Sequence, residues 1–283
     1  MSAIIKTSNG HAGSSVSAAG ANRPVTVPDF LAARGRGTRL TMLTAYDYSM
    51  ARLLDAAGVD GILVGDSLGM VVQGQSDSLA VTLDEMIYHT RMVMRGCRRA
   101  LVVVDMPFMS FQISPQQALE NAGRLVKEGG ARAVKLEGGV RSAEAIQAIA
   151  SADIPVMGHV GLTPQSVRRL GGFRVQRDEA RLLEDALAVE KAGAFAVVLE
   201  CLPSEVAQRI TDALKIPTIG IGAGAGCDGQ ILVTYDMLGL YDELHPRFVK
   251  QYAEVGQQIV QAVSEYCQEV REGKFPAAEH GFR

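Results

Sequence analysis

The sequence GARAVKLE at residues 130–137 decides the fold, and GAFAVVLE at residues 193–200 echoes it. Each copy starts with a glycine of the kind that ends helices, continues as an apolar run of strand length, and finishes with an acid. Residues 58–66 follow a looser version of the same rhythm. Units that alternate helix and strand resemble one another with or without a true internal repeat. The echo therefore predicts helix-then-strand units with an acid at the carboxyl end of the strand.

Further units of the same kind lie on both sides of this stretch. Helical periods of apolar residues separate most of the candidate strands, and parallel strands need such crossover helices. We expect strands at residues 40–45, 61–65, 100–105, 133–137, 154–159, 195–200, 218–222 and 230–234. Eight such units favour a closed (β/α)8 TIM barrel, and an open doubly wound α/β sheet is the alternative.

Composition excludes several classes of protein. The chain has 283 residues and a formal charge of −3, which argues against a partner that is nucleic acid. Its apolar runs all fall short of the ~20 residues that span a membrane. Four scattered cysteines fit a reduced, cytoplasmic protein better than a disulfide framework.

The chain ends differ from the centre. Residues 1–24 are rich in Ser, Ala and Gly and contain no acid, so we expect a flexible tail, with a transit peptide as the alternative. Residues 25–283 are expected to form one barrel domain that finishes with a long helix. An apolar stripe predicts that this helix packs on the barrel or contacts another subunit. The stripe comprises Phe248, Tyr252, Val255, Ile259, Val263, Tyr266 and Val270.

Ionisable residues gather where a barrel builds its active site, at the carboxyl ends of the strands. The acids there are Asp66, Asp105, Glu137 and Glu200, and the basic residues nearby are Lys135 and His159. Converging carboxylates repel one another unless a cation lies among them, and a hard divalent cation such as Mg²⁺ suits oxygen ligands. Any one of these acids could instead cap a helix or pair with Lys135, and a lone histidine in a strand is commonly a core residue.

A glycine-rich run at residues 220–226 has the look of a dinucleotide-binding loop, but no helical period follows it. We interpret it as a loop that allows backbone to approach a ligand, or as a plain turn.

Several runs resemble the ketopantoate (3-methyl-2-oxobutanoate) hydroxymethyltransferase family, in order along residues ~40 to ~245. They are TAYD (44–47), VGDSLGMVV (64–72), VTLDEMIYHT (81–90), DMPFM (105–109), KLEGG (135–139), GHVGLTPQ (158–165), LECLP (199–203) and residues 220–230. The resemblance implies a barrel of the phosphoenolpyruvate/pyruvate type. It also implies that a one-carbon unit passes from 5,10-methylenetetrahydrofolate to 3-methyl-2-oxobutanoate, which forms ketopantoate (2-dehydropantoate) for pantothenate biosynthesis.

The resemblance also implies roles for individual residues. Glu200 would be the general base that deprotonates the keto acid. Metal ligands for Mg²⁺ would be Asp66, Asp105 and Glu137, and substrate-binding residues would be Asp66, Ser67, Asp105, Lys135 and His159. The family is commonly a homodecamer. The stretch after Gln176 is shorter here than is usual in the family, which bears on contacts with the folate.

Two other functions compete with this one. A Mg²⁺-dependent C–C lyase or mutase of the related barrels would use the same metal and a 2-oxo acid. Isocitrate-lyase-like members carry a Lys-Cys-Gly-His run, which this sequence lacks. A barrel kept only for binding would be expected to have lost acids at its strand ends, and all four are present.

Overall fold

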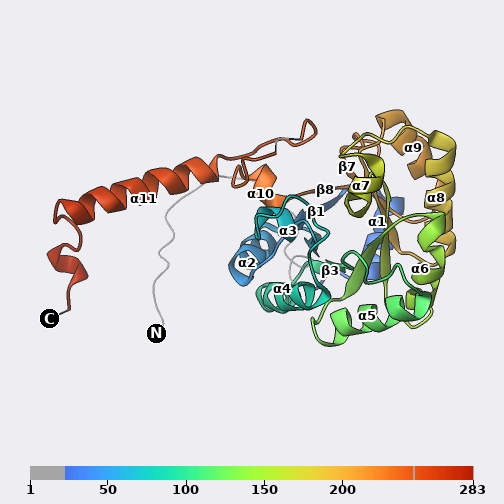
Figure 1. Ribbon diagram of the computed structural model, residues 1–283, viewed down its shortest axis with the longest axis horizontal. Helices are drawn as coiled ribbons and strands as arrows, with labels where there is room; N and C mark the ends of the chain where they lie inside the picture. Colours follow the sequence, from blue (N-terminus) through green and yellow to red (C-terminus); the bar gives the residue numbers. More distant parts are fainter. Residues whose placement is uncertain (1–22, 245, 283) are drawn as a thin grey trace.

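The computed structural model describes residues 23–244 and 246–282. In this part of the chain, eight parallel strands close into a barrel in sequence order (Figure 1). The strands are β1 Leu40–Thr44, β2 Gly61–Val64, β3 Leu101–Asp105, β4 Ala133–Glu137, β5 Val156–Gly161, β6 Ala196–Glu200, β7 Thr218–Ile221 and β8 Gly229–Leu232. Each predicted strand is present, with its ends shifted by at most two residues. Pairing of β1 with β8 closes the sheet, so the open-sheet alternative is wrong.

The described residues form several helices, most of which surround the barrel and cover its outer face (Figure 1). They are α1 Val27–Arg36, α2 Tyr48–Ala57, α3 Leu68–Val71, α4 Leu83–Gly96, α5 Pro115–Lys127, α6 Ala143–Ala150, α7 Val167–Leu170, α8 Glu179–Lys191, α9 Ser204–Ala213, α10 Thr234–Met237 and α11 Val255–Arg271, with 3₁₀ turns η1 Val140–Ser142, η2 Pro164–Ser166 and η3 Ala278–His280. None of the helices described is long and apolar enough to cross a membrane. The expected tail at residues 1–24 lies almost wholly outside the described residues.

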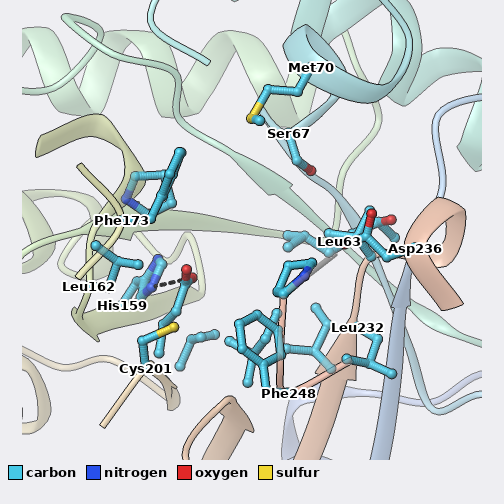
Figure 2. A pocket seen from close by; sticks show the side chains of 18 of the residues that line it. Leu63, Ser67, Met70, His159, Leu162, Phe173, Cys201, Leu232, Asp236 and Phe248 are labelled. Carbon is cyan, nitrogen blue, oxygen red and sulfur yellow. Dashed lines mark ion pairs between the residues drawn. The ribbon is translucent and has the colours of Figure 1, made fainter. Parts of the chain in front are cut away.

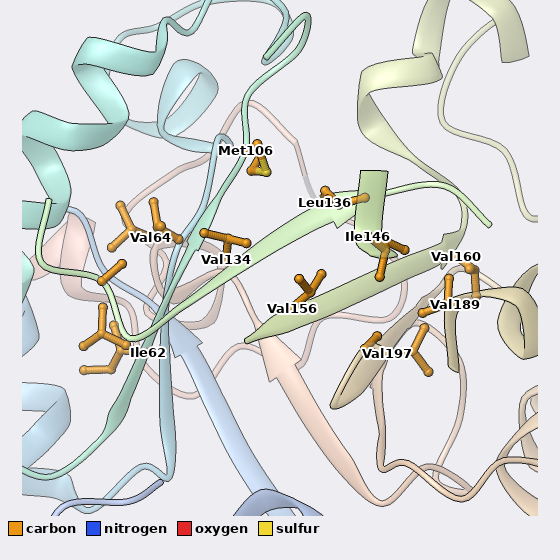
Figure 3. Close-up of a cluster of buried hydrophobic side chains, with 14 of the residues drawn as sticks. Ile62, Val64, Met106, Val134, Leu136, Ile146, Val156, Val160, Val189 and Val197 are labelled. Carbon is orange, nitrogen blue, oxygen red and sulfur yellow. The ribbon is translucent and has the colours of Figure 1, made fainter. Parts of the chain in front are cut away.

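The main core lies between the strands and the surrounding helices. Outward-facing strand residues such as Val134, Leu136 and Val156 share this core with Ile146 of α6 (Figure 3). Because both faces of the sheet are covered, the strands read as continuously apolar runs rather than alternating ones. This is why the sequence predicted them clearly.

The barrel interior changes from apolar to charged along the strands. Successive side chains of a strand point to opposite faces, so Leu101, Val103 and Asp105 of β3 all point inward. The lower layers are apolar and fully buried. Helix α1 closes the bottom of the barrel, where Phe30 packs edge-to-face on Phe195 with ring centroids 6.0 Å apart. The last inward residue of several strands is ionisable, which places the charged layer at the carboxyl end.

The expectation that the C-terminal helix packs on the barrel is wrong. Helix α11 projects away from the barrel and buries none of its residues (Figure 1). Phe248 and Tyr252, which the stripe included, precede the helix. An apolar stripe predicts that a helix face will be covered, but it does not say by what. Within the described part of this single chain the stripe stays exposed, with Ile259 and Val263 at 49% and 53%.

Candidate active site

The strand register brings the predicted ionisable residues together. Asp105 of β3 lies opposite Lys135 of β4, and Glu137 of β4 lies opposite His159 of β5. Their side chains point into the barrel from neighbouring strands. Asp66 follows β2 in the same layer, and its backbone N–H donates to Oδ2 of Asp105 at 3.0 Å. The convergence that the sequence predicted is therefore present in the structure.

Three buried carboxylates share one buried ammonium in this layer. The Nζ of Lys135 lies 2.7 Å from Oδ1 of Asp105. Burial alone would lower the pKa of Lys135, but the negative charges of Asp105 and Glu137 outweigh burial and raise it. Burial and the charge of Asp105 raise the pKa of Asp66 to about 7. Burial and the charge of Asp66 raise the pKa of Glu137 well above its usual range. With all three acids ionised the cluster would carry an excess of negative charge, which a further cation would relieve.

These residues fit a magnesium ion that takes some of its ligands from elsewhere. No three His, Cys, Asp or Glu side chains of the described residues lie close enough to hold a metal alone. Mg²⁺ commonly takes only one or two carboxylates and completes its shell with water and substrate oxygens. Asp66 and Asp105 form such a pair, and Oδ1 of Asp105 has no well-directed hydrogen bond. Glu137 differs from this pair, because its Oε2 accepts a hydrogen bond from the backbone N–H of Gln165 at 3.1 Å.

His159 connects this cluster to Glu200. Its Nδ1 lies 3.3 Å from Nζ of Lys135, and its Nε2 lies 3.2 Å from Oε2 of Glu200, which is the contact dashed in Figure 2. Burial and the charge of Lys135 lower the pKa of His159, so the ring is neutral near pH 7. An ammonium can only donate, so Nδ1 accepts and the ring proton lies on Nε2, which is close to Oε2 of Glu200 but forms no well-directed hydrogen bond with it. His159 is therefore placed to orient the Glu200 carboxylate.

Glu200 is the most accessible of these acids. Its side chain is 15% exposed, against 3% for Glu137 and 6% for Asp105. The next residue, Cys201, has a left-handed backbone with φ of 52°, a conformation that non-glycine residues seldom adopt. This turn ends β6 at Glu200, and the backbone N–H of Cys201 donates to the carbonyl of Ile221 at 2.9 Å. The tight turn leaves the Glu200 carboxylate at the open end of the barrel.

Ser67 is held by a residue that the sequence pattern did not predict. The phenol oxygen of Tyr46 lies 2.9 Å from Oγ of Ser67, and Tyr46 is 1% exposed. Gly65 leaves room for this arrangement, since a Cβ there would lie 2.8 Å from Oγ of Ser67. The hydroxyl of Ser67 is thus fixed beside the charged layer.

A cavity of about 420 Å³ opens above these residues. Figure 2 shows His159 deep in it, with Ser67 and Met70 on one side and Cys201, Leu232 and Phe248 around the remainder. The predicted site residues that line it are Asp66, Ser67, Asp105, Lys135, Glu137, His159 and Glu200. The cavity therefore contains every predicted site residue.

Two further residues of the candidate site were not predicted from the sequence. Gln165 and Tyr46 lie in the runs 158–165 and 44–47, but neither is a charged residue at the end of a strand, which is the pattern that predicts the other site residues. The glycine-rich run also has a structural use. A Cβ at Gly222 would lie 2.8 Å from the ring of Phe248, and one at Gly224 would lie 2.4 Å from Oγ of Ser204. These glycines allow close packing around the cavity and against α9.

Solved structures with this architecture share the fold at low identity. Phosphonopyruvate hydrolase in complex with oxalate and Mg²⁺ superposes with a TM-score of 0.59 at 14% identity, over 90% of this chain and 93% of that one. The 2,3-dimethylmalate lyase of the PEP mutase/isocitrate lyase superfamily gives 0.58 at 17% identity, over 90% and 91%. Likeness at this level establishes the fold alone, and it confirms the expected (β/α)8 barrel.

Sequence relatives are much closer. The 3-methyl-2-oxobutanoate hydroxymethyltransferase of Desulforapulum autotrophicum is 60% identical over 259 residues, which are 92% of this chain and 98% of that one. That of Clostridium beijerinckii is 58% identical over 262 residues, 91% and 95% of the two chains. The family model for ketopantoate hydroxymethyltransferase matches residues 24–278. These matches favour the hydroxymethyltransferase over the lyase or mutase alternative. The chain belongs to the ketopantoate hydroxymethyltransferase family.

Proposed function

We propose that this chain transfers a hydroxymethyl unit from 5,10-methylenetetrahydrofolate to 3-methyl-2-oxobutanoate. The net reaction consumes water and yields 2-dehydropantoate and tetrahydrofolate. Its chemical difficulty is removal of the C3 proton from the keto acid, which is a weak carbon acid. The observation that carries the proposal is the position of Glu200, an accessible carboxylate beside a buried cluster of three acids and one ammonium.

The buried cluster would bind the carboxylate and keto oxygens of the substrate. Lys135 supplies a positive charge, and the fixed hydroxyl of Ser67 supplies a hydrogen-bond donor or acceptor beside it. Asp66 and Asp105 would hold Mg²⁺, with Glu137 as the proposed third acid. When bound, Mg²⁺ supplies Lewis-acid stabilisation of the negative charge that develops on the keto oxygen.

Glu200 would accept the C3 proton of the keto acid. The Nε2 of His159 lies next to Oε2, so the other oxygen, Oε1, would be the one to take up the proton. The carbon so deprotonated forms a C–C bond to the one-carbon unit as one of that unit's two bonds to folate nitrogen breaks, and water displaces the other nitrogen. The two nitrogens of the tetrahydrofolate take up the proton from C3 and one proton from water. The hydroxyl oxygen of the product comes from water. Apolar walls around the cavity limit the access of bulk water to the carbanion.

We also propose that the chain assembles with copies of itself. The family resemblance implies that the assembly is a decamer. The exposed stripe on α11 supports this, since Ile259, Val263 and Tyr266 are 49%, 53% and 55% exposed. A large unpartnered apolar face is typical of subunit interfaces. Light scattering at micromolar concentration should give a mass well above that of one chain, and a monomer would contradict the assembly.

Isotope exchange tests the proposed chemistry. Proton NMR of the keto acid in D₂O with enzyme and Mg²⁺ should show the isopropyl methyl doublet collapse as C3 takes up deuterium. EDTA should stop the exchange. Glu200→Gln should abolish it while the variant still binds Mg²⁺ and the keto acid in calorimetry. Exchange by Glu200→Gln at the wild-type rate would remove Glu200 from the role of base.

A further inference from the structure

The cavity above Glu200 has a second, chemically distinct part. Its floor consists of the ionisable residues described above, whereas its upper wall is apolar and aromatic. The large apolar side chains of this wall are partly exposed around the opening: Phe173, Val175, Leu244 and Phe248 are 47%, 49%, 43% and 37% exposed. Exposed apolar groups that converge on one opening are typical of a binding surface.

This upper part is not needed by the keto acid. That substrate is small, and its charged and polar end matches the floor, where Lys135 and Ser67 lie. Beneath the floor the barrel is closed by buried apolar residues such as Met157 and Val198. A second reactant that must reach the carbon next to Glu200 therefore has to approach through the apolar upper part.

Phe248 is seated firmly in this wall. Its ring lies directly against the backbone at Gly222, where a Cβ would lie 2.8 Å from Cδ1. Gly222 has a φ of 63°, so both its conformation and the space it leaves favour glycine. The ring points into the cavity in Figure 2, with Phe173 and Leu162 also labelled around the opening. An aromatic ring in a fixed position is a low-entropy surface for stacking or edge contact.

The rim carries a positive charge above the apolar wall. Among the described residues that line the cavity, Arg247 is the only cation above the floor. Its side chain is exposed. A ligand that is aromatic near the floor and anionic at its outer end would match this order of surfaces.

We propose that Phe173 and Phe248 form an aromatic subsite for the pterin and aminobenzoyl rings of the one-carbon donor, with Arg247 contacting its glutamate carboxylate. This inference rests on the proposed function, because it takes the donor to be a reduced folate. The rings lie against the apolar wall, which places the one-carbon unit over the floor near Glu200. Charge at Arg247 fixes which end of the donor faces solvent.

Equilibrium binding tests the subsite without turnover. Calorimetric titration of tetrahydrofolate, which lacks the transferable carbon, is carried out with the full chain in the presence of keto acid and Mg²⁺. Phe248→Ala should weaken binding by about tenfold, and Arg247→Gln by about two- to fivefold with a weaker dependence on salt. Phe108→Ala is the matched control: Phe108 is also 37% exposed but lines a neighbouring hollow. It should leave the affinity unchanged.

Isotope exchange at C3 of the keto acid separates this inference from the proposed function. Phe248→Ala and the milder Phe248→Leu should both need more methylenetetrahydrofolate for transfer, whereas the control Phe108→Ala should need no more than the wild type. Unchanged tetrahydrofolate affinity in both Phe248 variants would overturn the subsite. An absence of exchange in the wild-type enzyme would instead contradict the enolisation chemistry, and the binding titrations would still decide where folate binds.

Discussion

The side-chain nitrogen of Gln165 lies 2.9 Å from Oδ2 of Asp66, a residue 99 positions earlier in the chain. The same nitrogen donates to the carbonyl of Met106 at 3.0 Å, and the backbone N–H of Gln165 donates to Glu137 at 3.1 Å. Gln165, in the turn η2, thus contacts two acids of the candidate metal site: Asp66, which follows β2, and Glu137 of β4. Because Gln165 is 7% exposed, water cannot readily replace these bonds.

Replacing Gln165 with Met keeps the length of the side chain and removes its polar atoms. Asp66 and the Met106 carbonyl then lose a buried donor, which should cost about 1–3 kcal/mol of unfolding free energy. Asp66 should also be less well oriented, so Mg²⁺ affinity should fall. Urea denaturation and calorimetric Mg²⁺ titration measure the two effects. Gln112→Met is the control, since Gln112 touches the cluster only through Gln165. Mg²⁺ affinity equal to wild type in Gln165→Met would contradict the positioning role.

Tyr46→Phe removes the phenol that holds Ser67. The lost hydrogen bond is worth about 0.5–1.5 kcal/mol, so the KM for the keto acid should rise about two- to tenfold with kcat nearly unchanged. Steady-state kinetics in the Ser67→Ala background provide the control. If Tyr46 acts through the Ser67 hydroxyl, Tyr46→Phe should raise KM no further there. An equal rise in both backgrounds would show that Tyr46 does not act through Ser67.

The sequence predicted the barrel and most of the site because both depend on short-range patterns. A strand buried on both faces is recognisable as an apolar run, and its carboxyl end locates Asp105, Glu137 and Glu200 on one rim. Gln165 was not predicted as a site residue, because its contacts depend on how a turn folds back over the rim. The direction of α11 was not predicted either, because amphipathic periodicity does not identify what the helix contacts.

Asp55 predicts a pH-dependent contribution to stability. Its carboxylate accepts backbone N–H groups of Arg98, Arg99 and Ala100 at 3.0, 3.0 and 2.7 Å, which fixes the entry to β3. Burial raises the pKa of Asp55, but these bonds lower it more, and the net shift is downward. A native pKa below the unfolded value stabilises the fold above about pH 4, and the contribution disappears as pH falls through the native pKa.

Asp55→Asn should therefore destabilise the protein by about 1–3 kcal/mol at pH 7, with a smaller difference from wild type at acid pH. Urea denaturation at several pH values measures this. Asp84→Asn serves as the control, because Asp84 is 80% exposed in its ion pair with Arg124 and should change stability by less than about 1 kcal/mol. A difference between Asp55→Asn and wild type that does not vary with pH would rule out the ionised carboxylate as its source.

Gly161 links the backbone of β5 to the position of Glu200. Its φ is 100°, and a Cβ there would lie 2.3 Å from the backbone carbonyl oxygen of Glu200. Gly161→Ala must therefore push the end of β6 away or strain its own backbone, and either response costs about 1–3 kcal/mol. Because Glu200 must reach C3 of the keto acid, a shift of its backbone should slow deuterium exchange at C3 by about 10-fold or more.

Gly74→Ala separates the two consequences of this substitution. Gly74 also has a positive φ, of 69°, but a Cβ there meets nothing within 4 Å. It should lose stability through backbone strain and keep the wild-type exchange rate. Thermal unfolding and exchange measured on both variants distinguish strain from displacement of Glu200. If Gly161→Ala is destabilised but exchanges deuterium as fast as Gly74→Ala, the backbone at Glu200 tolerates movement, and the exact position of β6 does not limit proton removal.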